Sequence, residues 1–181
     1  MAIIGFLRPA AVVAAALVMS MSLLVQPASA ADRYAPTSTD SDSARVVEGR
    51  ATGRQLANTN VTRAQYLVRT TRGGKKRMFI AKLKIANLRP YQSGQATRTG
   101  VYIYNFKGFN QNFQFSNSQN QSSCPSARLA NYQRLNLVVI KMRVNCIFSG
   151  PTLIQVSREI FAPRGSTVDS TRQVRWTIRR N

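Results

Sequence analysis

Alternation of apolar and polar side chains is the feature of this sequence that most limits what the chain can fold into. In Met78–Leu88 the odd positions from 79 to 85 are apolar, whereas Lys82 and Lys84 occupy even positions. In Leu135–Phe148 the even positions from 138 to 148 are apolar. Side chains of a β-strand point alternately to its two faces, so a period of two is typical of a half-buried strand. These segments therefore predict strands with one face in a core.

Shorter β-favouring segments recur at hairpin spacing around these two. Glycine-containing turn signals, such as Arg72-Gly73-Gly74-Lys75, separate several of them. The further predicted strands are Gln65–Thr70, Val101–Lys107, Thr152–Phe161 and Arg172–Arg180. A weak helical period at Ser126–Arg134 indicates one short helix. We expect an all-β fold, a single antiparallel sandwich or small barrel of about six to eight strands with at most one short helix.

Two segments leave alternatives open. Residues 110–121 contain eight Asn or Gln in twelve, with Phe113 and Phe115 as the apolar ones, which fits a long loop or a polar edge strand. Tyr102, Tyr104 and Phe106 alternate with apolar residues. Such an aromatic stripe usually belongs to a core, and its alternative is a stacking platform for bases or sugars.

The N-terminal thirty residues have the pattern of an export signal. An apolar stretch, Ala10–Val25, precedes the small-x-small sequence Ala28-Ser29-Ala30 that signal peptidases require. The stretch is shorter than the roughly 20 residues needed to span a bilayer, which argues against the alternative of an uncleaved anchor. We expect cleavage after Ala30, no integral membrane span thereafter, and a secreted or periplasmic protein, with an Ala-rich signal of bacterial style.

The remaining chain divides into a tail and one domain. Residues 31–48 are polar and hold four of the six acidic residues, so we expect a disordered tail there. Residues 49–181 then form a single basic β domain. Its two cysteines, Cys124 and Cys146, are expected to form one disulfide in an oxidising compartment, the alternative being two buried free thiols.

Positive charge dominates the composition. The chain has 26 Lys and Arg against 6 Asp and Glu, a formal charge of +20. Arg is far more frequent than Lys, and its planar guanidinium matches phosphate, sulfate and carboxylate groups. The predicted anion-binding residues are a hairpin tip with its following strand face, and a C-terminal strand face. They are Arg72, Lys75, Lys76, Arg77, Lys82 and Lys84, and then Arg172, Arg175, Arg179 and Arg180.

Catalytic chemistry has few candidates. The chain has no histidine, which excludes Ser-His-Asp triads, Cys-His pairs and histidine-bearing zinc sites. Only two acids, Glu159 and Asp169, follow residue 48. We therefore predict no catalytic residue, no metal and no cofactor. A histidine-free basic nuclease using Glu159 beside Arg158 is a remote alternative, and a solvated ion pair on a strand face is the simpler interpretation.

These observations favour binding of a polyanion by an exported protein. The candidates are cell-surface lipid phosphate, acidic polysaccharide and extracellular nucleic acid, and the sequence does not separate them. The alternative function is a structural or assembly subunit of the cell envelope or of a secretion or surface apparatus. Such a subunit would meet a protein partner through exposed strand edges.

Overall fold

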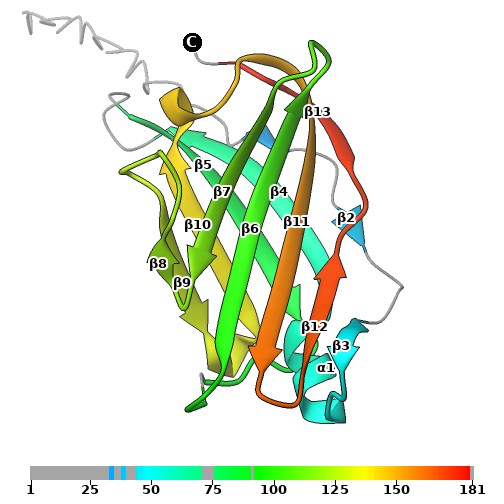
Figure 1. The fold of residues 1–181 in the computed structure, drawn as a ribbon. Helices are drawn as coiled ribbons and strands as arrows, with labels where there is room; N and C mark the ends of the chain where they lie inside the picture. Colours follow the sequence, from blue (N-terminus) through cyan, green and yellow to red (C-terminus); the bar gives the residue numbers. More distant parts are fainter. Residues whose placement is uncertain (1–32, 35–37, 40–43, 71–75, 91, 180–181) are drawn as a thin grey trace, which may run out of the picture.

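The protein is an all-β sandwich of two antiparallel sheets, as the alternation predicted (Figure 1). The computed structural model describes residues 33–34, 38–39, 44–70, 76–90 and 92–179. Two predicted segments lie outside this part of the chain. They are the export signal, residues 1–30, and the turn at residues 72–75.

The first sheet, sheet A, has the strand order β1-β4-β5-β10-β9, with β2 also paired to β4. Its central strands are the two segments with the clearest alternation. The strands are β1 (Arg33–Tyr34), β2 (Ser38–Thr39), β4 (Val61–Thr70), β5 (Arg77–Ile85), β9 (Arg128–Tyr132) and β10 (Leu137–Arg143).

The second sheet, sheet B, has the order β3-β12-β11-β6-β7-β8. The long strand β11 pairs with β6 on one side, and with both β12 and β13 on the other. The strands are β3 (Arg45–Gly49), β6 (Ala96–Asn105), β7 (Asn110–Ser116), β8 (Gln119–Asn120), β11 (Gly150–Ala162), β12 (Gly165–Ser170) and β13 (Val174–Ile178).

The hydrophobic core lies between the inner faces of the two sheets. Phe79 and Leu83 of β5 and Ile140 of β10 come from sheet A, and Ile103 and Val156 from sheet B, all fully buried. The polar segment 110–121 forms the strands β7 and β8 near the edge of sheet B, with Phe113 and Phe115 buried. Of the two interpretations of that segment, the edge strand is therefore correct.

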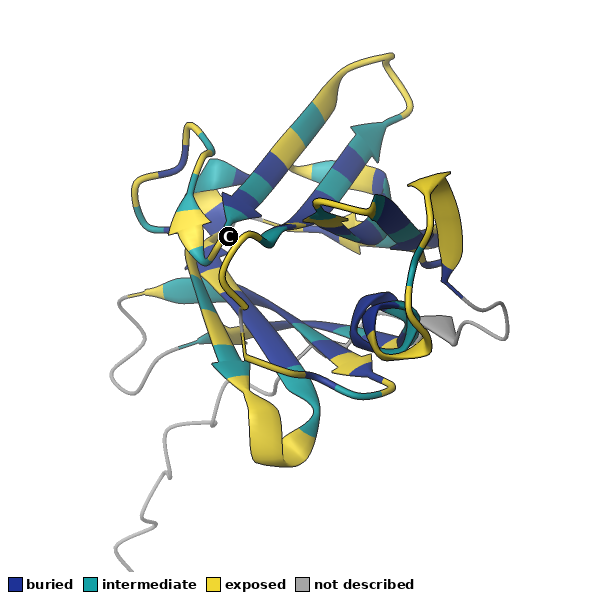
Figure 2. Ribbon diagram, turned by 60° about the horizontal axis from the view of Figure 1, so that its bottom comes forward, coloured by how far each residue is buried: buried dark blue, intermediate teal, exposed yellow. Residues whose placement is uncertain are grey.

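The helix predicted at Ser126–Arg134 is wrong. That segment forms β9 and a short 3-10 turn, η1 (Gln133–Leu135), because pairing with β10 extends its backbone. The helix lies earlier, at α1 (Gly53–Thr59), where Thr52 Oγ1 accepts a hydrogen bond from the Gln55 backbone N–H at 3.1 Å. In Figure 2, α1 lies at one end of the sandwich, between the sheets. It packs against β5, β11 and β12.

The disordered tail expected at residues 31–48 is also wrong where the structure describes it. β1 and β2 pair with β4, and β3 pairs with β12. Val46 and Val47 of β3 are 44% and 62% exposed, so apolar burial does not hold this strand in place. Backbone hydrogen bonding to the edge of β12 holds β3 in place, and amino-acid composition does not reveal such pairing.

A disulfide joins Cys124, in the β8–β9 connection, to Cys146, in the 3-10 turn η2 (Val144–Cys146). The S–S distance is 2.04 Å, and 22 positions separate the two residues. The predicted bridge is confirmed. It ties the connection between the two sheets to the end of β10.

Candidate functional site

The outer face of sheet A is basic. The residues that alternate with the core residues of β4, β5, β9 and β10 point away from sheet B, and seven of them are Arg or Lys. We call this set the basic face: Arg63, Arg69, Lys82, Lys84, Arg128, Lys141 and Arg143. All are exposed except Lys82, which is half-buried.

Cations lie directly opposite cations on this face. Arg63 is the cross-strand partner of Lys84, and Lys141 is the partner of Arg128. Like charges in directly opposed positions destabilise a sheet. Two unit charges at the spacing of opposed Cβ atoms, about 5 Å, repel by about 1 to 3 kcal/mol depending on solvent exposure, and charged ends that point apart repel less. The repulsion therefore opposes folding.

Counter-charges lie elsewhere in the described part of the chain. The acidic residues there are Glu48, Glu159 and Asp169, on β3, β11 and β12, all in sheet B. On the outer face of sheet B, by contrast, a cation lies opposite an anion. Arg98 of β6 lies across from Glu159 of β11, with 3.4 Å between Nη1 and Oε2.

The centre of the basic face is apolar. Leu67, Ile80 and Val139 form a small buried cluster on this side of sheet A, with Met78 and Leu137 packed against it. Two of the surrounding cations also hold backbone: Lys84 Nζ donates to the Leu135 carbonyl at 2.6 Å, and Arg128 Nη1 donates to the Pro125 carbonyl at 2.6 Å. The face therefore has charged groups around an apolar centre, and backbone carbonyls hold two of those groups.

The structure divides the predicted anion-binding residues between the two sheets. Lys82 and Lys84 lie on the basic face, and Lys76 and Arg77 lie at the start of β5. Arg172, Arg175 and Arg179 are exposed in and beside β13 of sheet B, where the Arg175 guanidinium lies 4.9 Å above the centre of the Phe106 ring. Arg72, Lys75 and Arg180 lie outside the described residues.

Five cations of the basic face were not among the predicted anion-binding residues: Arg63, Arg69, Arg128, Lys141 and Arg143. The alternation of Leu137–Arg143 already placed Lys141 and Arg143 on a polar face. It could not show that this strand lies between β5 and β9, and so beside Lys82 and Arg128.

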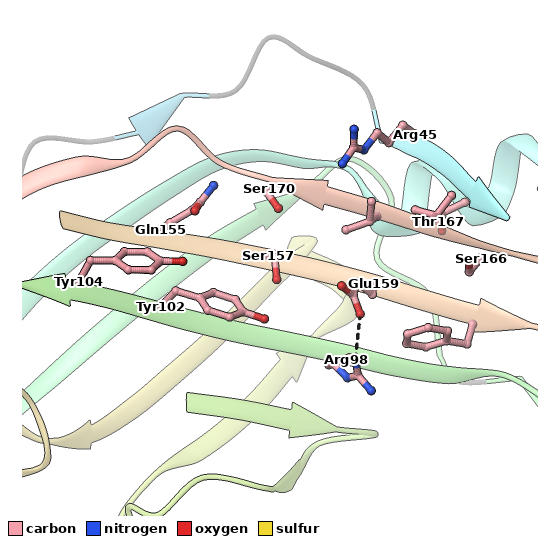
Figure 3. Close-up of a pocket in the computed structure, with 13 residues that line it drawn as sticks. Arg45, Arg98, Tyr102, Tyr104, Gln155, Ser157, Glu159, Ser166, Thr167 and Ser170 are labelled. Carbon is pink, nitrogen blue, oxygen red and sulfur yellow. Dashed lines mark hydrogen bonds and ion pairs between the residues drawn. The ribbon is translucent and has the colours of Figure 1, made fainter. Parts of the chain in front are cut away.

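A groove of about 570 Å³ crosses the outer face of sheet B (Figure 3). Strands β6, β11 and β12 form its floor, and β3 forms one side. Its lining combines aromatic, hydroxyl, amide and charged groups: Arg45, Val47, Arg98, Tyr102, Tyr104, Gln155, Ser157, Glu159, Phe161, Ser166, Thr167, Val168 and Ser170.

The aromatic stripe of β6 belongs to this outer face. Tyr102 and Tyr104 are half-buried and line the groove, and Phe106 is 57% exposed beyond the end of the strand. Val101 and Ile103 fill the core instead. The interpretation of the stripe as core is therefore wrong, because both faces of this strand carry apolar or aromatic residues and alternation alone does not say which face is inside.

The two candidate carboxylates lie on opposite faces of sheet B. Glu159 points into the groove, whereas Asp169 is buried and accepts a hydrogen bond from the Val61 backbone N–H at 2.6 Å. Arg158 is fully buried, facing away from Glu159. The constellation considered for a nuclease is thus not brought together, and Glu159 forms a strand-face ion pair with Arg98.

The described residues give no sign of a metal site or a membrane-spanning helix, and comparison with known proteins adds no indication of function. Within the described ranges, no three Cys, Asp or Glu residues gather as metal ligands, and no helix is long and apolar enough to cross a membrane. Searches against protein-family models, curated proteins and solved structures found no match to the chain. Fold and surface define an all-β sandwich with a basic face on one sheet and an aromatic groove on the other.

Proposed function

We propose that the protein is exported and binds a polyanion through the basic face of sheet A. The observation that carries this proposal is the direct opposition of Arg63 to Lys84 and of Arg128 to Lys141, on a sheet without an acidic partner among its described residues. A multivalent anion lying across the strands would turn this repulsion into attraction. The energy that opposes folding would then favour binding.

Geometry also supports an extended ligand. Neighbouring strands lie about 4.8 Å apart, so cations on β4, β5, β10 and β9 cover a width of about 14 Å. Arg can grip phosphate, sulfate or carboxylate oxygens in a fork, and Lys adds point charge. Lipid phosphate, acidic polysaccharide and extracellular nucleic acid share this chemistry, and the proposal covers all three.

A structural or assembly subunit is the second candidate. It is supported by β3, the terminal strand of sheet B, whose Val46 and Val47 side chains are 44% and 62% exposed. An exposed edge of this kind can accept a strand from a neighbouring molecule. Size exclusion across a range of concentrations detects such association, and a monomer at every concentration would contradict self-assembly.

The polyanion proposal is tested by comparing two variants with the same change in net charge. Heparin, a single-stranded oligonucleotide and vesicles containing phosphatidylglycerol serve as probes. The face variant carries Arg63→Glu, Lys82→Glu, Lys141→Glu and Arg143→Glu. The control variant carries Arg50→Glu, Arg54→Glu, Arg89→Glu and Arg164→Glu, all exposed positions away from that face.

We expect the face variant to lose at least about tenfold more affinity than the control for at least one probe. Circular dichroism and thermal melting establish that both variants are folded. Equal losses in the two variants would contradict a site on sheet A, because a response to net charge alone does not depend on where the charges lie.

A further inference from the structure

The floor of the groove on sheet B is a row of small residues. Gly100 of β6 lies opposite Ser157 of β11, which in turn lies opposite Ser170 of β12. The adjacent row on one side contains Tyr102 and Gln155, and the row on the other side contains the Arg98–Glu159 pair. The groove therefore crosses three strands, with an aromatic and amide wall facing a charged one.

Tyr102 lies flat along the sheet. A Cβ atom on Gly100 would come 3.0 Å from Tyr102 Cε2 and 3.2 Å from Cζ, so the absence of a side chain at Gly100 makes room for the ring. Gln114 Nε2 donates to the Tyr102 hydroxyl at 3.0 Å and fixes its far end. Figure 3 shows the Tyr102 and Tyr104 rings following one another along β6. The ring of Tyr102 is thus held before any ligand arrives.

Polar groups converge on the same space. Ser157 is only 8% exposed and lines the groove, and its hydroxyl forms no hydrogen bond within the described part of the chain. Gln155 Nε2 donates to the Thr171 carbonyl at 2.9 Å, which orients the amide and leaves its oxygen as an acceptor. A fixed aromatic face beside a hydroxyl that opens into the groove and has no partner among the described residues is the arrangement of a ligand site.

We propose that this groove binds an uncharged saccharide chain, with one sugar ring stacked on Tyr102. The C–H face of a pyranose packs against an aromatic ring, while its hydroxyls exchange hydrogen bonds with Ser157, Gln155 and Glu159. The guanidinium of Arg98 pairs with Glu159, and the other cation of the lining, Arg45, is exposed on β3 at the side of the groove, so the floor itself does not demand a charged ligand. This site lies on the other sheet from the basic face and does not depend on polyanion binding.

The length and openness of the groove favour an extended chain. Three strands about 4.8 Å apart give a floor of about 10 Å, enough for about two sugar rings. A β-1,4-linked chain runs straight enough to follow this floor with one ring over Tyr102. A helical α-1,4-linked chain does not.

The test is a titration followed by ¹H–¹⁵N NMR at high salt, where polyanion binding is screened. The probes are cellohexaose and chitohexaose, with maltohexaose as the α-linked comparison. We expect saturable shifts of the Gly100 backbone amide and of the Gln155 and Gln114 side-chain amides with a β-linked probe. No shift of these signals at about 10 mM of each saccharide, far above a useful Kd, would overturn the proposal.

Variants then locate the site. Tyr102→Ala should weaken binding at least about tenfold, and Tyr132→Ala, an exposed tyrosine on sheet A, should leave it unchanged. Gly100→Ala keeps every proposed contact group but displaces the Tyr102 ring, so it should also weaken binding. Gln155→Ala, at a half-buried position, removes a proposed hydrogen-bonding group and should also weaken binding. Equal saccharide affinity in Tyr102→Ala and Tyr132→Ala would contradict the stacking. The face variant should keep its saccharide affinity, because its substitutions lie on the other sheet.

Discussion

Arg158 of β11 and Asp169 of β12 lie directly opposite each other, and both side chains are buried between the two sheets. Arg158 Nε donates to the Asn58 carbonyl at 2.8 Å, and its Nη1 donates to Thr99 Oγ1 at 2.8 Å. Asp169 accepts from the backbone of Val61. These contacts fasten α1 and the start of β4 to sheet B.

Replacing Arg158 should therefore destabilise the fold strongly. Arg158→Met removes the donors and leaves the buried Asp169 without its cross-strand cation, for a loss of about 3–5 kcal/mol in free energy of unfolding. The control is Arg98→Met on the outer face, where loss of an exposed ion pair costs about 1 kcal/mol or less. Chemical denaturation measures both. Similar losses for the two variants would contradict a structural role for Arg158.

The pairing of β3 with β12 is tested at Gly49. This residue has φ +67°, and a Cβ there would overlap the carbonyl oxygen of Arg164. Gly49→Ala should lower stability by about 1–3 kcal/mol. Gly53→Ala, in α1 with nothing within 4 Å of the new Cβ, should be neutral or stabilise by up to about 1 kcal/mol. Thermal melting compares them, and an unchanged Gly49→Ala would show that β3 contributes no stability.

The disulfide should supply a substantial part of the stability. Closing 22 residues between Cys124 and Cys146 is worth about 3 kcal/mol in the chain-entropy model. Cys124→Ala with Cys146→Ala should therefore lower Tm by on the order of 10 °C. Reduction of the natural protein should have the same effect. Equal Tm values for the reduced and the oxidised protein would contradict this prediction.

Tyr66 should make the fold sensitive to alkali. Burial raises the pKa of Tyr66 above its ordinary value, and a hydrogen bond with Thr171 only partly offsets this. Below about pH 10 the phenol is neutral in both states and stability is unaffected by it. Above that pH the unfolded chain releases the proton and the folded chain keeps it, so the free energy of unfolding falls. Tyr66→Phe should show a weaker decline in stability between pH 9 and 11, as measured by urea denaturation at about half-unit intervals.

Local alternation predicted the fold class because the central strands β5 and β10 both show it. The segment with Phe79 and Leu83 and the segment with Ile140 needed only their own residues to be identified as strands with one buried face. The disulfide followed from having two cysteines. By contrast, β3 depends on backbone pairing with a strand more than a hundred residues away, and no composition of residues 45–49 announces that partner.

The sequence could predict that a cationic strand face exists, but not which residues from other strands belong to each site. Lys82 and Lys84 were visible as a cationic strand face, but Arg63 and Arg128 join them only through strand order. The groove depends on Gly100, Ser157 and Ser170 standing side by side from three separate strands. Such rows are set by register, which the sequence of one strand does not contain.

The salt dependence of binding tests the central claim most directly. Affinity for a single-stranded oligonucleotide is measured from about 50 to 300 mM salt, for the natural protein, the face variant and the control variant. Contact of four to seven cations with phosphates predicts that log K falls with log salt at a slope of about −3 to −5. The face variant should flatten this slope by about 3, and the control should keep it. A salt-independent affinity, or an equal slope in both variants, would contradict polyanion binding by the outer face of sheet A.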